Sequence, residues 1–168
     1  MVMSDVIRLL YIDDDPELCD LFKVSVEPLG YVVETALTGK EGITLKKNNS
    51  YDLIVIDCQL PDMSGIDIAR SLISNWPNLP ILMITDENNL HVTIEALTLG
   101  ITNYVVKDTE QAYLNLIPSI ILHLLDRARR RLGQINAQIA LEKSEKKFRT
   151  LYHQSPIGVS LEDYSSVK

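Results

Sequence analysis

Side chains that could bind a cation and attack an electrophile directly follow short apolar runs of the sequence. Asp13, Asp14 and Asp15 follow the run 7–12, Asp57 follows 53–56, Thr85 follows 81–84, and Lys107 follows 104–106. Parallel strands place their carboxyl ends at one edge of an α/β sheet, so we expect these side chains to converge. At ~4 Å and an effective dielectric of about 20, each pair of carboxylates costs on the order of 4 kcal/mol. We therefore expect a cation at Asp13, Asp14 and Asp57, and hard oxygen ligands with room for water favour Mg²⁺.

The hydroxyl and the amine extend this prediction to a reaction. A phosphoryl group near Asp57 needs a positive charge and a hydroxyl donor on its oxygens, which Lys107 and Thr85 would supply. Asp57 is then a candidate nucleophile, because a carboxylate can form an acyl phosphate. The competing interpretation is that Asp residues at strand ends only cap helices. Capping explains Asp15 well, but it does not explain acid, acid, hydroxyl and amine at four strand ends.

Five apolar runs and the helical segments between them must position these side chains. Three of the runs 7–12, 31–36, 53–56, 81–84 and 104–106 are nearly continuous and rich in Val, Ile and Leu, which is typical of strands covered on both faces. The segments between them carry apolar stripes at helical spacing: Leu18, Leu21, Phe22, Ser25 and Leu29; Ile66, Ala69, Leu72, Ile73 and Trp76; and Leu90, Ile94, Leu97 and Ile101. Helix starts are predicted at Asp15 before Pro16, at Thr38 with Glu41 and at Ser64 with Asp67, and helix ends at Gly30 and Gly100. Five β/α repeats with right-handed crossovers predict an α/β fold, a doubly wound, five-stranded parallel sheet in flavodoxin-like order.

The pattern changes after Lys107 to a single long helix. A short turn near 111–116 leads to Pro118, which suits a helix start. Apolar residues then recur at alternating spacings of four and three, forming a heptad seam of Ile121, Leu125, Ala128, Leu132, Ile135 and Ile139. A helix over 118–150 would be roughly 50 Å long, too long to pack wholly on the preceding domain. It could be one amphipathic helix with a frayed end, but the length of the seam favours a two-stranded coiled coil and hence a homodimer.

Charge is divided unevenly along the chain. The 168 residues carry a net charge of −7, with 18 acidic and 7 basic side chains in residues 1–125 and 5 acidic and 9 basic in residues 126–168. The acidic part argues against binding of nucleic acid, and the arginines of 127–131 flank the seam as a solvated face. Cys19 and Cys58 lack the spacing of a disulfide framework or a zinc site. No apolar run reaches ~18 residues and residues 1–5 do not begin a signal peptide, so we expect a cytoplasmic protein without membrane contact.

Several stretches taken together resemble the receiver domains of two-component response regulators. They are 11–16 (Tyr-Ile-Asp-Asp-Asp-Pro), 55–57 (Val-Ile-Asp) with 60–65 (Leu-Pro-Asp-Met-Ser-Gly), 83–85 (Met-Ile-Thr) and 103–107 (Asn-Tyr-Val-Val-Lys). The similarity covers residues 6–125, and the combination is much more specific than any one of its motifs.

The resemblance implies a role for each matching residue. Asp57 matches the aspartate that receives a phosphoryl group from the phosphohistidine of a histidine kinase or a histidine phosphotransfer protein. Asp13 and Asp14 match the acidic pair that holds Mg²⁺, and Gln59 stands where a backbone carbonyl completes the metal site. Thr85 and Lys107 match the residues that bind the phosphoryl oxygens. Tyr104 matches an aromatic switch residue, although an ordinary aromatic at a strand edge would explain it as well.

Two residues depart from the usual receiver pattern. Asp86 follows Thr85 where many receivers have a small residue, and Glu87 comes next, so extra negative charge lies beside the expected pocket. Asp108 follows Lys107 where most receivers have proline after a cis bond. A cis bond before a non-proline residue costs about 3 kcal/mol, so we expect a rearranged loop there.

The last residues carry a second, weaker resemblance. Residues 144–149 and 155–159 look like the start of a PAS sensory domain, which would need roughly 100 residues to bury a core. A disordered polar tail is the alternative. The predicted organisation is thus a receiver over 1–125, a coiled-coil-like helix over 126–150 and the start of a PAS domain over 151–168.

The function predicted from the sequence is that of a phosphorylation-dependent switch, not an enzyme acting on separate substrates. One alternative is a degenerate receiver that binds partners without phosphorylation, which Asp86 and Asp108 make plausible. Another is an Mg²⁺-dependent aspartyl phosphohydrolase. That enzyme would need a substrate-capping insertion and a second acid near Asp57, whereas no connection is long enough for a cap and Asp62 is the only acid shortly after it.

Overall fold

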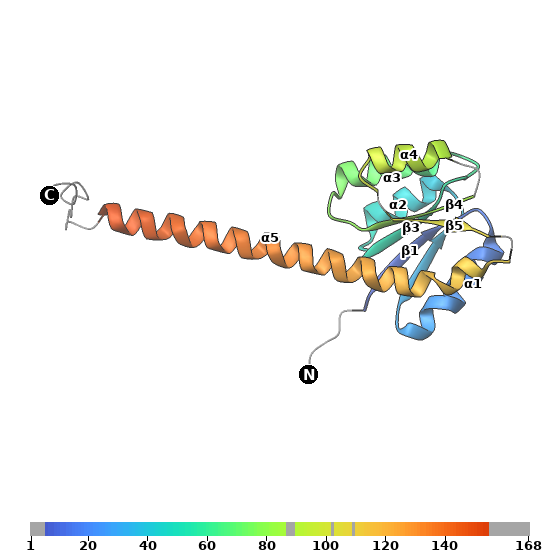
Figure 1. Cartoon of the computed structure of the whole chain (residues 1–168), viewed down its shortest axis with the longest axis horizontal. Helices are drawn as coiled ribbons and strands as arrows, with labels where there is room; N and C mark the ends of the chain where they lie inside the picture. The colour runs from blue at the N-terminus through green and yellow to red at the C-terminus, as the bar shows by residue number, and fades with distance from the viewer. Residues whose placement is uncertain (1–5, 87–89, 102, 109, 155–168) are drawn as a thin grey trace, which may run out of the picture. The chain divides into compact units, whose positions relative to one another are not determined.

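A parallel β-sheet of five strands forms the centre of the N-terminal part of the chain (Figure 1). The computed structural model describes residues 6–86, 90–101, 103–108 and 110–154, with the side chains of 90–93 and 153–154 excepted. The strands are β1 (Arg8–Ile12), β2 (Val32–Ala36), β3 (Leu53–Asp57), β4 (Ile81–Asp86) and β5 (Tyr104–Lys107), in the order β2-β1-β3-β4-β5. The helices are α1 (Pro16–Val26), α2 (Gly39–Asn48), α3 (Gly65–Asn75), α4 (Leu90–Thr98) and α5 (Ile117–Gln154), with short 3₁₀ helices η1 (Glu27–Leu29) and η2 (Ala112–Asn115).

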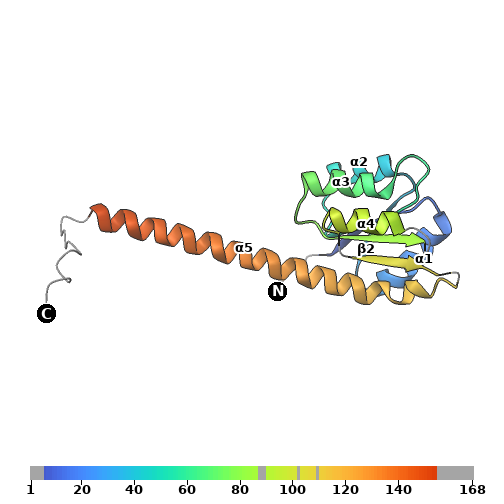
Figure 2. The same cartoon turned by 45° about the horizontal axis from the view of Figure 1, so that its top comes forward.

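The two faces of the sheet are covered by different helices. Figures 1 and 2 show α2, α3 and α4 on one face, and α1 with the beginning of α5 on the other. Each face of the sheet has its own hydrophobic core, and alternate residues of the strands contribute side chains to one core or the other, as expected of a parallel sheet buried on both sides. The α1 and α5 side contains Leu9, Tyr11, Phe22, Val55, Ile84 and Ile121, and the other contains Leu10, Ile12, Ile54, Ile56, Ile68 and Leu72. The predicted doubly wound, flavodoxin-like sheet is confirmed.

Capping residues start the helices largely where the sequence predicts. The carboxylate of Asp15 accepts hydrogen bonds from the N–H groups of Glu17 and Leu18, ahead of Pro16 in the first turn of α1. Thr38 caps α2, but the Glu41 carboxylate accepts from Leu37 N–H and not from Thr38 N–H. Ser64 caps α3 through Ile66 N–H. The carboxylate of Asp67, in the first turn of this helix, pairs with Arg70.

Two of the three predicted apolar stripes differ from the faces that the helices bury. In α1 the buried residues are Cys19, Phe22 and Val26, while Leu21 and Leu29 of the predicted stripe are exposed. Among the described side chains of α4 and the segment after it, Ala96 and Ile101 are buried, while Ile94 and Leu97 are exposed. The stripe of α3 is confirmed, with Ile66, Ala69 and Leu72 buried. Gly30 and Gly100 both have positive φ, 91° and 81°, as expected of glycines that end helical segments.

Helix α5 begins with Ile117 and contains the whole predicted seam. The seam divides into two halves with different surroundings: Ile121 and Leu125 are buried in the core beside α1, whereas Leu132, Ile135 and Ile139 are exposed. The chain divides into two compact units, Met1–Ala128 and Arg129–Lys168. Within the described residues, no helix is both long enough and apolar enough to cross a membrane. Most of the predicted PAS segment, residues 155–168, lies outside the described part of the chain.

Candidate functional site

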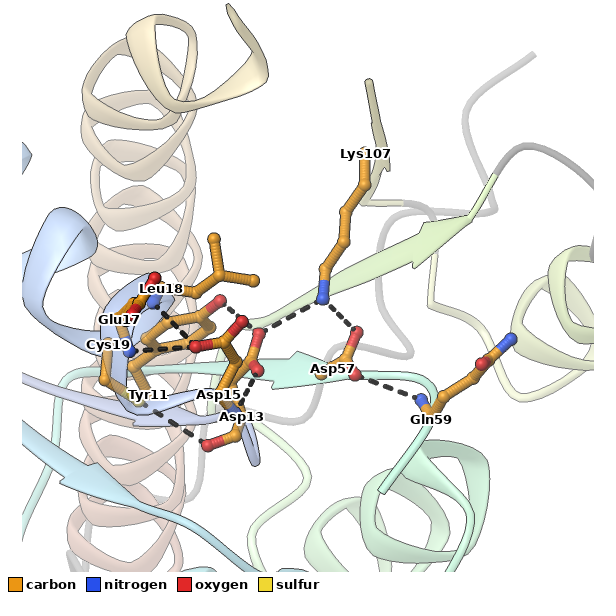
Figure 3. A network of polar contacts seen from close by, with 9 residues as sticks. All are labelled: Tyr11, Asp13, Asp15, Glu17, Leu18, Cys19, Asp57, Gln59 and Lys107. Atoms are coloured by element: carbon orange, nitrogen blue, oxygen red, sulfur yellow. Dashed lines mark hydrogen bonds and ion pairs between the residues drawn. The ribbon is translucent and has the colours of Figure 1, made fainter. Parts of the chain in front are cut away.

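Two carboxylates and one amine meet at the carboxyl edge of the sheet, as Figure 3 shows. Asp13 follows β1, Asp57 ends β3, and Lys107 ends β5 on the far side of β4. The Lys107 Nζ lies 2.9 Å from Oδ1 of Asp57 and 3.2 Å from Oδ2 of Asp13. The lysine therefore bridges two strand ends that would otherwise repel each other.

Asp14 completes a group of three carboxylates suited to a divalent cation. Asp13, Asp14 and Asp57 each present an oxygen within 4.8 Å of the others. Asp13 and Asp57 are buried, with 1% and 5% of their surfaces exposed, while Asp14 is exposed. Hard oxygen donors with one side open to water match the preference of Mg²⁺ for few protein ligands and several waters. The donor set thus fits the ion that the sequence predicts.

The electrostatics of this group follow from its burial. Burial raises the pKa of Asp57 to about 6, even though the contact with Lys107 lowers it. Burial also lowers the pKa of Lys107, but the attraction of Asp57 and Asp13 outweighs this effect and holds the pKa above its usual value. Lys107 is therefore charged at neutral pH and serves as the counter-ion of both carboxylates.

The backbone packs closely around Asp57. A Cβ on Gly65 would lie 2.4 Å from the carbonyl oxygen of Asp57 and 2.8 Å from the Cα of Cys58, so only glycine fits there. The N–H of Gly65 donates to the carbonyl of Cys58 at 3.1 Å. Cys58 itself is buried, and burial raises the pKa of its thiol to about 12. The start of α3 thus holds the strand end that carries Asp57.

Comparison with known proteins identifies the family of this arrangement. Residues 9–117 match the family model of the response regulator receiver domain. The chain belongs to the response regulator receiver domain family. It is 36% identical over 100 residues to the response regulator SaeR of Staphylococcus aureus strain USA300, an alignment that covers 60% of this chain but only 43% of SaeR.

Solved structures show the same receiver fold. A CheY-like receiver domain protein from Methanospirillum hungatei JF-1 aligns with a TM-score of 0.70 and 28% identity, over 76% of this chain and 99% of that chain. The chemotaxis response regulator CheY4 of Vibrio cholerae aligns with a TM-score of 0.60 and 27% identity, over 73% of this chain and 98% of that chain. The chain thus spans a full receiver domain and less than half the length of SaeR.

The three remaining predicted site residues of the receiver differ in their surroundings. Thr85 is buried in β4, and its hydroxyl donates to the carbonyl of Asp86 at 3.4 Å. Gln59 directs its backbone N–H at Oδ2 of Asp57, at 3.3 Å. Tyr104, at the start of β5, is 42% exposed and its ring does not lie in the core. The roles of these three residues in the receiver stay predictions.

Asp108 has a structural role that explains its place after Lys107. Its carboxylate accepts three backbone hydrogen bonds, from Glu110 at 3.1 Å, Ala112 at 2.7 Å and Tyr113 at 2.7 Å. The described backbone contains no cis peptide bond. The loop after β5 is therefore stabilised by the Asp108 carboxylate, which accepts hydrogen bonds from N–H groups before and within η2. Asp86, the other departure from the receiver pattern, is exposed at the end of β4. Glu87 lies outside the described residues.

Two tyrosines near the receiver's acidic group were not predicted from the sequence. The hydroxyl of Tyr11 donates to Oδ2 of Asp13 at 2.5 Å, and burial with the nearby charge of Asp13 raises the pKa of this phenol. Tyr113 is buried beside α1. The sequence does hold a signal for Tyr11, since residues two apart on a strand share a face.

Proposed function

We propose that this receiver takes a phosphoryl group on Asp57 from the phosphohistidine of a histidine kinase or histidine phosphotransfer protein. The observation that carries the proposal is the bridge from Lys107 to two buried carboxylates at one sheet edge. A half-buried lysine held between two acids is positioned to pair with the oxygens of an incoming phosphoryl group. Mg²⁺ would be held by Asp13, Asp14, Asp57 and the backbone carbonyl of Gln59.

The chain's own residues would carry each part of the transfer. An ionised oxygen of Asp57 attacks phosphorus, the new O–P bond forms as the P–N bond of phosphohistidine breaks, and the electron pair stays on the imidazole nitrogen. Lys107 exchanges its contact with Asp57 for the phosphoryl oxygens, and Thr85 donates its hydroxyl to them. Mg²⁺, when bound, would supply positive charge there.

Phosphorylation would change the surface formed by α4, β5 and α5. It adds about two negative charges, enough to bias a structure with two states of similar free energy. Tyr104 would turn inward as Thr85 moves toward the phosphoryl group. The change would reach a homodimer contact along the exposed half of α5.

The strength of the proposed dimer depends on the exposed half of the heptad seam in α5. Leu132, Ile135 and Ile139 span little more than one heptad, because Ile121 and Leu125 are already buried in the receiver. A contact this short is weak by itself, which suits a dimer controlled by phosphorylation. We further propose a cytoplasmic location, in keeping with two free buried cysteines, and a PAS domain beginning in 151–168.

Intact-mass measurement after incubation with acetyl phosphate tests this function. We expect a single phosphoryl adduct that requires Mg²⁺ and is absent from Asp57→Asn. Steady release of phosphate from many substrates would instead indicate the phosphohydrolase. Mg²⁺ binding without an adduct from acetyl phosphate or any histidine kinase would indicate an unphosphorylated interaction module.

A further inference from the structure

The phenol of Tyr11 lies directly against the candidate cation site. Tyr11 is fully buried in β1, two residues before Asp13, and its ring stacks on Phe22 with the centroids 4.3 Å apart. Its hydroxyl donates to Oδ2 of Asp13 at 2.5 Å, as Figure 3 shows. A hydrogen bond this short to an ionised acceptor is among the strong ones in proteins.

Both oxygens of the Asp13 carboxylate are engaged. Oδ1 accepts from the N–H of Asp15 at 3.0 Å, and Oδ2 accepts from Tyr11 and from Nζ of Lys107 at 3.2 Å. Of these three donors only Lys107 also contacts Asp57. When Lys107 moves to a phosphoryl group, Tyr11 becomes the remaining donor to Oδ2.

We propose that Tyr11 is a positioning residue, which holds the Asp13 carboxylate in the orientation that the cation site requires. This inference rests on the proposed function, since it concerns the same Mg²⁺ site. Asp13 is almost fully buried, so a carboxylate without the phenol would turn away from the site or draw in another donor. Outer partners of this kind fix the geometry of metal ligands, and their loss typically reduces metal affinity by about 10–100-fold.

The structure offers a matched pair of variants for the test. Tyr11→Phe removes only the hydroxyl and keeps the ring that stacks on Phe22. Tyr113→Phe also removes a buried phenolic hydroxyl, but among the described residues this hydroxyl has no hydrogen-bond partner. Only the first change should affect the orientation of Asp13.

The experiment is a titration of the ¹⁵N-labelled full chain with MgCl₂, in which the amide chemical shifts of Asp14 and Gln59 report Mg²⁺ binding. We expect the dissociation constant for Mg²⁺ to rise about tenfold in Tyr11→Phe and to stay unchanged in Tyr113→Phe. Thermal unfolding without Mg²⁺ would be compared alongside, because a purely structural tyrosine would lower the melting temperature without changing the affinity of the folded protein. An unchanged or tighter dissociation constant in Tyr11→Phe overturns the inference.

A second measurement covers the case in which Tyr11→Phe does not fold. In the wild-type chain the hydroxyl proton of Tyr11 should give a protected, strongly downfield resonance that shifts when MgCl₂ is added. Absence of this resonance, or no response to Mg²⁺, contradicts the inference. If the wild-type amides themselves show no Mg²⁺ binding, both the proposed function and this inference fail. If wild type and Tyr11→Phe bind Mg²⁺ equally well, only the inference about Tyr11 fails.

Discussion

Replacing Lys107 by methionine should destabilise the metal-free protein in a pH-dependent way. Methionine keeps much of the length of the side chain and removes its charge, so Asp13 and Asp57 lose their shared counter-ion. Asp13 keeps its bonds to Tyr11 and Asp15, whereas among the described residues Asp57 keeps only the N–H of Gln59 at 3.3 Å. Most of the loss should therefore fall on Asp57.

The size of the effect follows from burial and from the pKa of Asp57. The side chains of Lys107 and Asp57 are 19% and 7% exposed, and removing one member of a buried pair costs about 3–5 kcal/mol. Ionising Asp57 in the fold costs free energy, because its pKa is raised from 3.8 to about 6. That cost is absent at pH values below the pKa of Asp57 in the unfolded chain, and it is complete at pH values above the pKa of Asp57 in the fold. Lys107 lowers this pKa, so its loss raises the pKa further and extends the cost to higher pH.

Urea unfolding of Lys107→Met and wild type, in EDTA at pH 5 to 8, measures the effect. We expect a loss of about 3 kcal/mol at pH 8, which shrinks by up to about 1.4 kcal/mol for each pH unit toward pH 6. Added MgCl₂ should recover part of it. The control Lys47→Met removes an exposed lysine and should change stability by less than about 0.5 kcal/mol. An equal loss at pH 5 and pH 8, or less than about 1 kcal/mol at pH 8, would refute the reasoning.

Three further predictions concern the loop after β5, the start of α3, and α5. Asp108→Ala should lower the free energy of unfolding in urea by about 1–2 kcal/mol, since three N–H groups lose their acceptor, and Asp108→Asn should lose less; equal stability of the alanine variant and wild type would contradict this cap. Gly65→Ala should cost about 1–3 kcal/mol and slow phosphoryl uptake, because its Cβ would overlap the backbone of Asp57. Gly133→Ala is the control, because a Cβ there has no atom within 4 Å, and it should stabilise α5 by about 0.5–1 kcal/mol. A higher melting temperature for Gly65→Ala than for Gly133→Ala would rule out the close approach at Gly65. Ile135→Asn should abolish concentration-dependent dimerisation in sedimentation experiments while the neighbouring Gln134→Asn does not, and equal dimerisation by both would exclude the exposed seam as the contact.

The sequence was sufficient to predict the sheet and the edge that carries the site. Apolar runs ending in Asp13, Asp57 and Lys107, combined with the rule for carboxyl edges, place these residues together without any structure. What it did not provide was the bridge itself, because the reach of Lys107 across β4 depends on the twist of the sheet and the path of a flexible side chain.

Periodicity alone proved weaker for the helices than for the strands. A heptad seam looks the same whether it faces a domain core or a partner helix, so the burial of Ile121 and Leu125 could not be distinguished from the exposure of Ile135. In α1 the buried face is formed by Cys19, Phe22 and Val26 rather than by Leu21 and Leu29, and the apolar spacing alone does not distinguish the two faces. The cap made by Asp108 depends on a loop conformation that no local spacing specifies.

The most direct test of the central proposal is to trap the acyl phosphate at its residue. After incubation with acetyl phosphate and Mg²⁺, borohydride reduces an aspartyl phosphate to homoserine, and peptide mass spectrometry then locates the reduced position. We predict homoserine at position 57 alone, only when Mg²⁺ and acetyl phosphate are both present. Reduction at another aspartate, or at none while a phosphoryl adduct persists, would contradict the assignment of Asp57 as the phosphoacceptor.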